Sequence, residues 1–253
     1  MPRRRLGQHF LIKGSVLERI ARVVCPEREP LVIEIGPGRG ALTEKLMARA
    51  GRVVAIEIDS ELVQFLRDKF HAEPRLTVIE GDALSTDLSQ WGPAAIAGNL
   101  PYYAATPIIE KVLAPEAGLV RAAFLVQKEV GLRLAAAPGS RDYGYLSVHT
   151  RLFADAEALF EVRPSAFRPP PKVDSMLVRL KPHRRAVELG IASEEQFLAF
   201  VGLCFRQKRK TIRNNLAAVY GKQAVDGWPE AGKRAEQLTV EQLAGLFRRL
   251  VPS

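Results

Sequence analysis

Short apolar runs alternate with amphipathic stretches along the chain up to residue 181. Five of the runs have the length and β-branched content of buried strands, and they lie at 31–35, 53–58, 76–80, 94–98 and 122–127. Helical patterns lie between some of them, as at 41–50 and 60–70. Strands that alternate with helices predict a doubly wound α/β fold with a mainly parallel sheet.

The pattern changes near residue 181. Two β-rich runs, at 159–163 and 176–180, have no clear helix between them and predict a pair of strands at one sheet edge. The next segment, Lys181-Pro182-His183-Arg184-Arg185, has the composition of a linker, and only helical patterns follow it, at 194–205, 209–220 and 240–250. We therefore expect a larger α/β domain over residues 1–181 and a small all-helical domain over 182–253.

Composition and charge narrow the classes of partner. Of the 253 residues 47% are hydrophobic and 26% charged, as in a globular protein with a sizeable core. The net charge of +9 favours a polyanionic partner, either nucleic acid or an anionic membrane surface. No apolar run is long enough to span a bilayer, and the two cysteines, Cys25 and Cys204, form no metal-binding pair. We expect a cytoplasmic protein that uses no metal and no membrane.

A glycine-rich loop, Gly36-Pro37-Gly38-Arg39-Gly40, follows the first predicted strand and precedes a helix. Glycines let the backbone turn sharply and approach a ligand closely. Glu57 ends the next strand, where a carboxylate can accept hydrogen bonds from ribose hydroxyls. The spacing G-x-G-x-G, with Glu34 before it, favours S-adenosylmethionine over a dinucleotide, because that cofactor has cationic groups and no phosphate. A tight turn without a ligand is the alternative for Gly36 and Gly38.

Asp82 ends the third strand at the same edge of the sheet, in Gly81-Asp82-Ala83-Leu84. Ligands of such sheets bind at the carboxyl ends of the strands, so Asp82 can accept a hydrogen bond from the adenine amine of the cofactor. The alternative is a loop or helix-capping aspartate.

The fourth strand ends in Asn99-Leu100-Pro101-Tyr102, the most specific feature of the chain. The exocyclic amine of adenine is a poor nucleophile, because its lone pair is delocalised into the ring. The amide oxygen of Asn99 and a backbone carbonyl, from Pro101 or a neighbour, can hold the two amine hydrogens and localise that lone pair. Tyr102 can stack on the base, which must leave its own stack to enter the pocket. Positioning and electrostatics would supply most of the rate. A simple turn before a helix at 104–107 is the alternative.

On these motifs the chain resembles the ribosomal RNA adenine dimethyltransferases, in particular the bacterial small-subunit type. The resemblance spans nearly the whole chain. It includes the motifs above and also Arg4-Arg5-Leu6-Gly7-Gln8-His9-Phe10-Leu11, Val126-Gln127-Lys128-Glu129-Val130, the segment from Phe167 to Ser175 and that from Arg209 to Leu216. It implies a class I methyltransferase fold, with a Rossmann-like, mostly parallel seven-stranded sheet in 1–181 and a helical domain in 182–253 that binds RNA or the ribosome.

The resemblance also implies the roles of particular residues. The expected cofactor contacts are His9, Leu11, Gly36, Gly38, Glu57, Ile58, Asp82, Ala83 and Asn99. Position 9 departs from the family pattern, which usually has asparagine there, and Tyr103 stands where asparagine is common. Phe167 becomes a second aromatic face for the target adenine, opposite Tyr102, and the stiff Pro169-Pro170-Pro171 segment after it is compatible with that role. Packing of Phe167 beneath its own loop is the alternative.

Two basic clusters are the expected RNA contacts, because cations that bind phosphate release counterions. They consist of Arg3, Arg4 and Arg5 at the N-terminus and of Arg206, Lys208, Arg209, Lys210 and Arg213 in the helical domain.

The expected activity is dimethylation of the N6 amines of two adjacent adenosines near the 3′ end of 16S rRNA, by a monomer acting on the immature small subunit. The alternatives are a 23S rRNA adenine methyltransferase of the resistance type and a non-catalytic assembly or transcription factor with the same fold. An NAD-dependent dehydrogenase is a more distant alternative.

Overall fold

The computed structural model describes residues 8–114 and 117–251 of the chain. The chain divides into two compact units, one formed by residues 1–131 and 156–182 and the other by residues 132–155 and 183–253. The sequence pattern predicts that residues 132–155 belong with the sheet. The structure differs, because helix α6 (Tyr145–Phe153) buries one side against helix α7 of the second unit.

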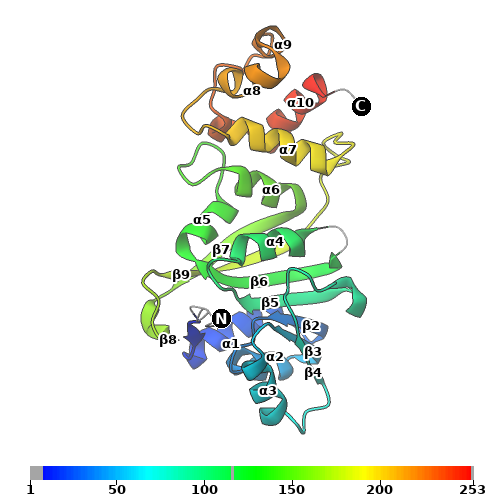
Figure 1. Ribbon diagram of the computed structural model, residues 1–253, viewed down its shortest axis with the longest axis vertical. Coiled ribbons are helices and arrows are strands. Elements are labelled where there is room, and N and C mark those ends of the chain that lie inside the picture. Colours follow the sequence, from blue (N-terminus) through cyan, green and yellow to red (C-terminus); the bar gives the residue numbers. More distant parts are fainter. Residues whose placement is uncertain (1–7, 115–116, 252–253) are drawn as a thin grey trace, which may run out of the picture. The chain divides into compact units, whose positions relative to one another are not determined.

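The first unit is built around a seven-stranded sheet with the strand order β4-β3-β2-β5-β6-β9-β7 (Figure 1). Neighbouring strands from β4 to β6 are parallel, whereas β9 is antiparallel to β6. The predicted pair of strands at one edge is confirmed as β9 and β7. The bounds are β2 Glu29–Ile35, β3 Ala50–Glu57, β4 Leu76–Glu80, β5 Ala94–Asn99, β6 Leu119–Gln127, β7 Ala154–Val162 and β9 Ser175–Pro182. The predicted Rossmann-like, mostly parallel seven-stranded sheet is confirmed.

Helices α1 (Gly14–Val24) and α2 (Ala41–Met47) pack together and share one apolar cluster with alternate residues of the central strands. Helix α2 is shorter than the pattern at 41–50 predicts, because Ala50 already pairs with Glu29 at the start of β3. The other elements of this part of the chain are α3 (Ser60–Lys69), η1 (Ser89–Trp91), α4 (Ala105–Leu113), α5 (Lys128–Ala135) and η3 (Pro164–Ala166).

Strand register brings the carboxyl ends of β2, β3, β4 and β5 to one edge of the sheet. Ile35 lies opposite both Ile56 and Gly98, and Glu57 lies opposite Glu80. The loops that follow these strands therefore meet, although they are far apart in the sequence. A separate two-stranded ladder of β1 (Phe10–Leu11) and β8 (Phe167–Arg168) is also part of this unit.

The second unit is helical, with α7 (Glu194–Phe205) in contact with α6, α8 and α10. Its core is aromatic: the ring centroids of Phe197 and Phe200 lie 5.4 and 5.6 Å from that of Phe247. The remaining elements are α8 (Ile212–Tyr220), α9 (Lys222–Asp226), η4 (Ala235–Gln237) and α10 (Val240–Leu250). Helix α8 begins later than the pattern at 209–220 predicts, because Thr211 caps it by accepting from the Asn214 amide. In the described ranges no helix has the length and apolar character needed to cross a membrane.

Candidate active site

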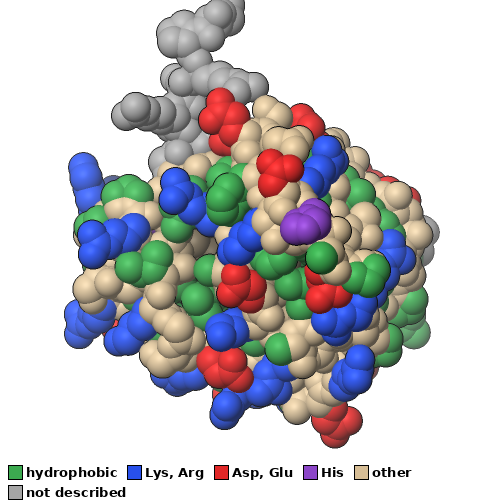
Figure 2. Space-filling view, turned by 90° about the horizontal axis from the view of Figure 1, so that it is seen from below, with side chains coloured by type: hydrophobic (Ala, Val, Ile, Leu, Met, Phe, Trp, Pro, Cys, Tyr) green, Lys and Arg blue, Asp and Glu red, His purple; other side chains and the backbone are tan. Residues whose placement is uncertain are grey.

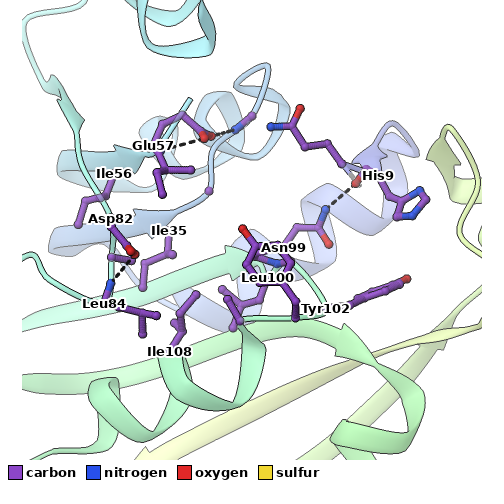
Figure 3. A pocket seen from close by; sticks show the side chains of 18 of the residues that line it. His9, Ile35, Ile56, Glu57, Asp82, Leu84, Asn99, Leu100, Tyr102 and Ile108 are labelled. Carbon is purple, nitrogen blue, oxygen red and sulfur yellow. Dashed lines mark hydrogen bonds between the residues drawn. The ribbon is translucent and has the colours of Figure 1, made fainter. Parts of the chain in front are cut away.

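A pocket of about 210 Å³ opens where the carboxyl ends of β2 to β5 meet (Figure 3). Most of the residues predicted for the site line it. They are His9, Gly36, Gly38, Glu57, Ile58, Asp82, Ala83, Asn99, Leu100, Pro101, Tyr102 and Phe167. The structure thus gathers into one cavity residues that the sequence places on six separate segments.

The glycine loop owes its shape to three left-handed residues, Gly36, Gly38 and Gly40, with φ of 69°, 57° and 78°. A Cβ at Gly38 would lie 3.0 Å from the Phe10 ring, so a side chain there would fit only if that ring moved. Both observations explain why glycine is needed at the pocket floor.

Glu57 ties that loop to β3. Its carboxylate accepts hydrogen bonds from the backbone amide of Gly38 at 3.1 Å and from those of Ile58 and Asp59 at 3.0 and 3.1 Å (Figure 3). The side chain is 5% exposed, and burial raises the pKa of its carboxyl. Glu57 thus shapes the glycine loop and also offers carboxylate oxygens at the pocket wall.

Glu34 lies behind the loop and is not among the pocket residues. It is 1% exposed and accepts a hydrogen bond of 2.6 Å from the Thr43 hydroxyl on α2. Burial raises the pKa of Glu34 to about 7. Its role in the structure is therefore to join β2 to α2 from inside the core.

Asp82 follows β4, and its carboxylate accepts a hydrogen bond of 2.9 Å from the backbone amide of Leu84. Asp82 thus stabilises its loop and also lines the pocket, and its contact with the adenine amine of the cofactor stays a prediction. Ile58 and Leu84, which line the same pocket, are 50% and 40% exposed. Two exposed aliphatic side chains beside two carboxylates make a site suited to a flat, apolar ring with polar substituents.

Asn99 is fixed at the end of β5 by the N-terminal segment. Its amide nitrogen donates a hydrogen bond of 2.9 Å to the main-chain carbonyl of His9 (Figure 3). This bond orients the amide and leaves the Asn99 oxygen as an acceptor.

Two backbone carbonyls follow Asn99, and they differ in what they bind. The Pro101 carbonyl accepts from the Ala104 amide at 3.0 Å, at the turn that begins α4. No described donor pairs with the Leu100 carbonyl, and Leu100 lines the pocket. The Leu100 carbonyl is therefore the one of the two that is unpaired and could accept a hydrogen bond from the amine of a target adenine.

Tyr102 stands at the pocket wall between two other segments. Its ring centroid lies 5.8 Å from that of His9, and its hydroxyl lies 3.4 Å from the buried Ser175 hydroxyl of β9. The imidazole of His9 is in turn hydrogen-bonded to the Pro169 carbonyl at 2.8 Å. His9 therefore links the N-terminal segment, the Tyr102 ring and the proline-rich segment.

The β1–β8 ladder places Leu11 opposite Phe167. Phe167 is 3% exposed, lines the pocket and also belongs to the apolar core, and its role as a face for the target adenine stays a prediction. Leu11 is different: its buried side chain joins the core and is not among the pocket residues, and its predicted cofactor contact stays a prediction. Strand alternation turns Leu11 toward the core and Phe10 toward the pocket.

Several pocket residues were not among the predicted site residues. They are Gln8, Phe10, Ile35, Ile56, Gly81, Leu84, Tyr103, Ala104 and Ile108. Most of them adjoin a predicted site residue, so the strand ends at Ile35 and Ile56 could have been found by extending each motif. Ile108 carries no such signal, because only the packing of α4 brings it to the pocket.

The predicted RNA contacts of the second unit lie on and before α8. Arg206, Lys208, Arg209 and Lys210 are exposed, and the Lys208 ammonium donates to the Arg141 carbonyl at 2.8 Å. Arg213 forms an ion pair with Asp226. Arg3, Arg4 and Arg5 lie outside the described residues.

Comparison of the chain with known protein families identifies the family to which it belongs. The family model described as "Ribosomal RNA adenine dimethylase" matches residues 2–251. The chain belongs to this family. A ribosomal RNA small subunit methyltransferase A of Acidobacterium capsulatum is 44% identical over 97% of this chain and 90% of its own length. One of Geobacter sulfurreducens is 39% identical over 98% and 95%.

Solved structures of related enzymes agree with this family. A dimethyladenosine transferase from Plasmodium falciparum superposes with a TM-score of 0.81 and 27% identity, over 94% of this chain and 96% of its own. The 23S rRNA methyltransferase ErmE gives a TM-score of 0.73 and 28% identity, over 95% and 99%. The family resemblance drawn from the sequence motifs is confirmed.

Proposed function

We propose that this protein uses S-adenosylmethionine to dimethylate the N6 amines of two adjacent adenosines in a hairpin loop near the 3′ end of 16S rRNA. The observation that carries the proposal is the Asn99 amide, which the His9 carbonyl orients beside Tyr102 in the same pocket as Glu57 and Asp82. Membership of the adenine dimethylase family and the small-subunit names of its relatives support the choice of substrate. This dimethylation is part of small-subunit biogenesis.

The cofactor half of the pocket is the part formed by β2, β3 and β4. Ile58 and Leu84 cover the faces of the cofactor adenine, Glu57 accepts from the ribose hydroxyls, and Asp82 accepts from the adenine amine. S-adenosylmethionine, when bound, supplies an electrophilic methyl group on a sulfonium. The left-handed Gly36 and Gly38 keep side chains away from it.

The target half of the pocket is the part formed by the end of β5 and the β1–β8 ladder. Asn99 and the Leu100 carbonyl accept the two hydrogens of the target amine, which directs its lone pair toward the methyl group. Tyr102 and Phe167 bind the faces of the flipped base. No general base is required at the first step, because the amine loses its proton after the methyl group has been transferred.

RNA binding beyond the pocket is assigned to the basic residues of the second unit, Arg206, Lys208, Arg209, Lys210 and Arg213. All five are exposed; the first four have no carboxylate partner among the described residues, whereas Arg213 is paired with Asp226. Figure 2 shows a face of the molecule on which Lys and Arg side chains are spread among other residues rather than gathered in one patch.

The test is incubation with labelled S-adenosylmethionine and either immature small subunits or large-subunit RNA. We expect the label in 16S rRNA, and mass spectrometry should find two adjacent dimethyladenosines there. In cells that lack the protein, 16S rRNA should lack both dimethyladenosines. The likeness to ErmE makes 23S rRNA the second candidate substrate. Labelling of large-subunit RNA alone would overturn the proposal.

A further inference from the structure

Tyr103 is an exposed aromatic side chain at the pocket. It follows Tyr102 directly, lines the pocket and is 66% exposed. Among the large hydrophobic residues of the described part of the chain, the other exposed aromatic side chain is Phe65, which is 45% exposed. No hydrogen bond, ion pair or ring contact with another described residue holds the Tyr103 side chain. The ring is therefore free to bind a flat group.

Tyr102 and Tyr103 differ in their surroundings. The Tyr102 side chain is partly buried between the His9 ring and the Ser175 hydroxyl, so it belongs to the inner wall. The ring of Tyr103 remains in solvent, which places it at the mouth. Two successive aromatic rings at different depths fit two different bases rather than one.

Two exposed arginines adjoin Phe10, another residue of the same pocket. Phe10 also lines the pocket, and the Arg39 guanidinium lies over its ring at 5.2 Å. Arg168 pairs with Phe10 in the β1–β8 ladder. Both arginine side chains are exposed, and no described carboxylate forms an ion pair with either. Exposed cations that flank one pocket residue, in a pocket that also has an exposed aromatic ring, are features of sites that bind single-stranded RNA.

We propose that Tyr103 is a stacking platform for the base of the adenosine adjacent to the one held in the pocket. The inference rests on the proposed function and deepens it. An adenosine that enters the pocket leaves its neighbour without a stacking partner. A ring at the mouth replaces that partner and holds the second adenosine in line for its own turn in the pocket.

The test compares Tyr103→Ala, Tyr103→Leu and Tyr103→Phe in methylation of small subunits that carry unmethylated 16S rRNA. Loss of one base–aromatic stack lowers kcat/KM roughly tenfold. We expect this loss in the Ala and Leu variants, while Phe, which keeps the ring, stays near the wild type. Affinity for S-adenosylmethionine, measured by calorimetry, stays unchanged in all three. Phe65→Ala, which removes the other exposed aromatic ring, is the matched control and keeps full activity.

A second set of particles carries an abasic nucleotide in place of the adjacent adenosine, and the first methyl transfer to the remaining adenosine is followed. Here Tyr103→Ala causes no further loss, because the base it would stack on is absent. An equal loss on both particles, wild-type activity of Tyr103→Ala on intact particles, or weaker cofactor binding would each overturn the inference. A wild-type protein that labels no 16S rRNA would instead overturn the proposed function.

Discussion

At the scale of single residues, Asn99 is central to the proposed chemistry. Its amide nitrogen donates to the His9 carbonyl, so its proposed role depends on the remaining oxygen. Glu57 and Glu34 are both buried, but their carboxyl groups lie in different surroundings. Glu57 faces the pocket, whereas the Glu34 carboxyl bonds the Thr43 hydroxyl inside the core.

Asn99→Ala removes the acceptor for the amine and the anchor to His9. We expect methyl transfer to fall by roughly 100-fold or more, as for loss of one preorganised hydrogen-bonding group in a polar transition state. Particle binding should be retained, since phosphate contacts lie elsewhere. Labelled methyl transfer and filter binding measure the two quantities. Gln64→Ala, which alters an exposed amide on α3, is the control, and normal methylation by the Asn99 variant would contradict the proposed chemistry.

Glu34 makes stability depend on pH in a defined direction. Burial raises its pKa from 4.5 to about 7, so the folded state binds a proton more tightly than the unfolded chain does. The resulting stabilisation is complete below pH 4.5 and is lost as the pH rises through 7. Glu34→Gln removes this dependence.

The Tm of Glu34→Gln should therefore rise relative to that of the wild type between pH 5 and pH 8, in thermal unfolding followed by circular dichroism. Glu27→Gln, at an exposed loop position, serves as the control and should parallel the wild type. A constant difference between the Glu34 variant and the wild type across this range would refute the assignment.

At the scale of elements, the site depends on the close approach of β2 and β5. A Cβ at Gly98 would lie 2.5 Å from the Ile35 carbonyl oxygen, a backbone atom that cannot move without shifting β2. The two strands carry the glycine loop and the Asn99 segment, so their separation sets the distance between the two halves of the pocket.

Gly98→Ala should destabilise the protein by about 1–3 kcal/mol, the usual cost of overpacking, and lower the methylation rate. Urea unfolding and labelled methyl transfer measure the two effects. Gly14→Ala, at the start of α1 where no atom lies within 4 Å of the added Cβ, should leave both nearly unchanged. Equal behaviour of the two variants would show that the β2–β5 spacing is not limiting.

At the scale of the whole molecule, the net charge of +9 favours association with RNA, which is negatively charged. The exposed residues Lys208, Arg209 and Lys210 precede α8 in the second unit, whereas the pocket belongs to the first. Substitution of the cluster should therefore affect binding of the particle and leave the cofactor site intact.

The triple change of Lys208, Arg209 and Lys210 to alanine should weaken particle binding and reduce the slope of log K against log salt by roughly two. Affinity for S-adenosylmethionine should not change. Removal of Arg28, Arg52 and Arg67, exposed cations of the first unit, lowers the net charge equally and is the control. Equal salt slopes for the two triples would assign the effect to net charge alone.

The sequence by itself determined the parts of the protein that depend on short segments. Gly36-Pro37-Gly38, Glu57, Asp82 and the Asn99 segment each follow a strand, and parallel strands bring such ends to one edge of a sheet. The helices at 194–205 and 240–250 were likewise predictable, because their caps and apolar spacing are local.

Only the tertiary structure decided how distant segments meet. The His9 carbonyl binds the Asn99 amide 90 positions along the chain, and the His9 ring binds the Pro169 carbonyl 160 positions away. Leu11 turned toward the core, and residues 132–155 joined the helical unit. These outcomes follow from pairing and packing between elements, which no local pattern of hydrophobic and polar residues encodes.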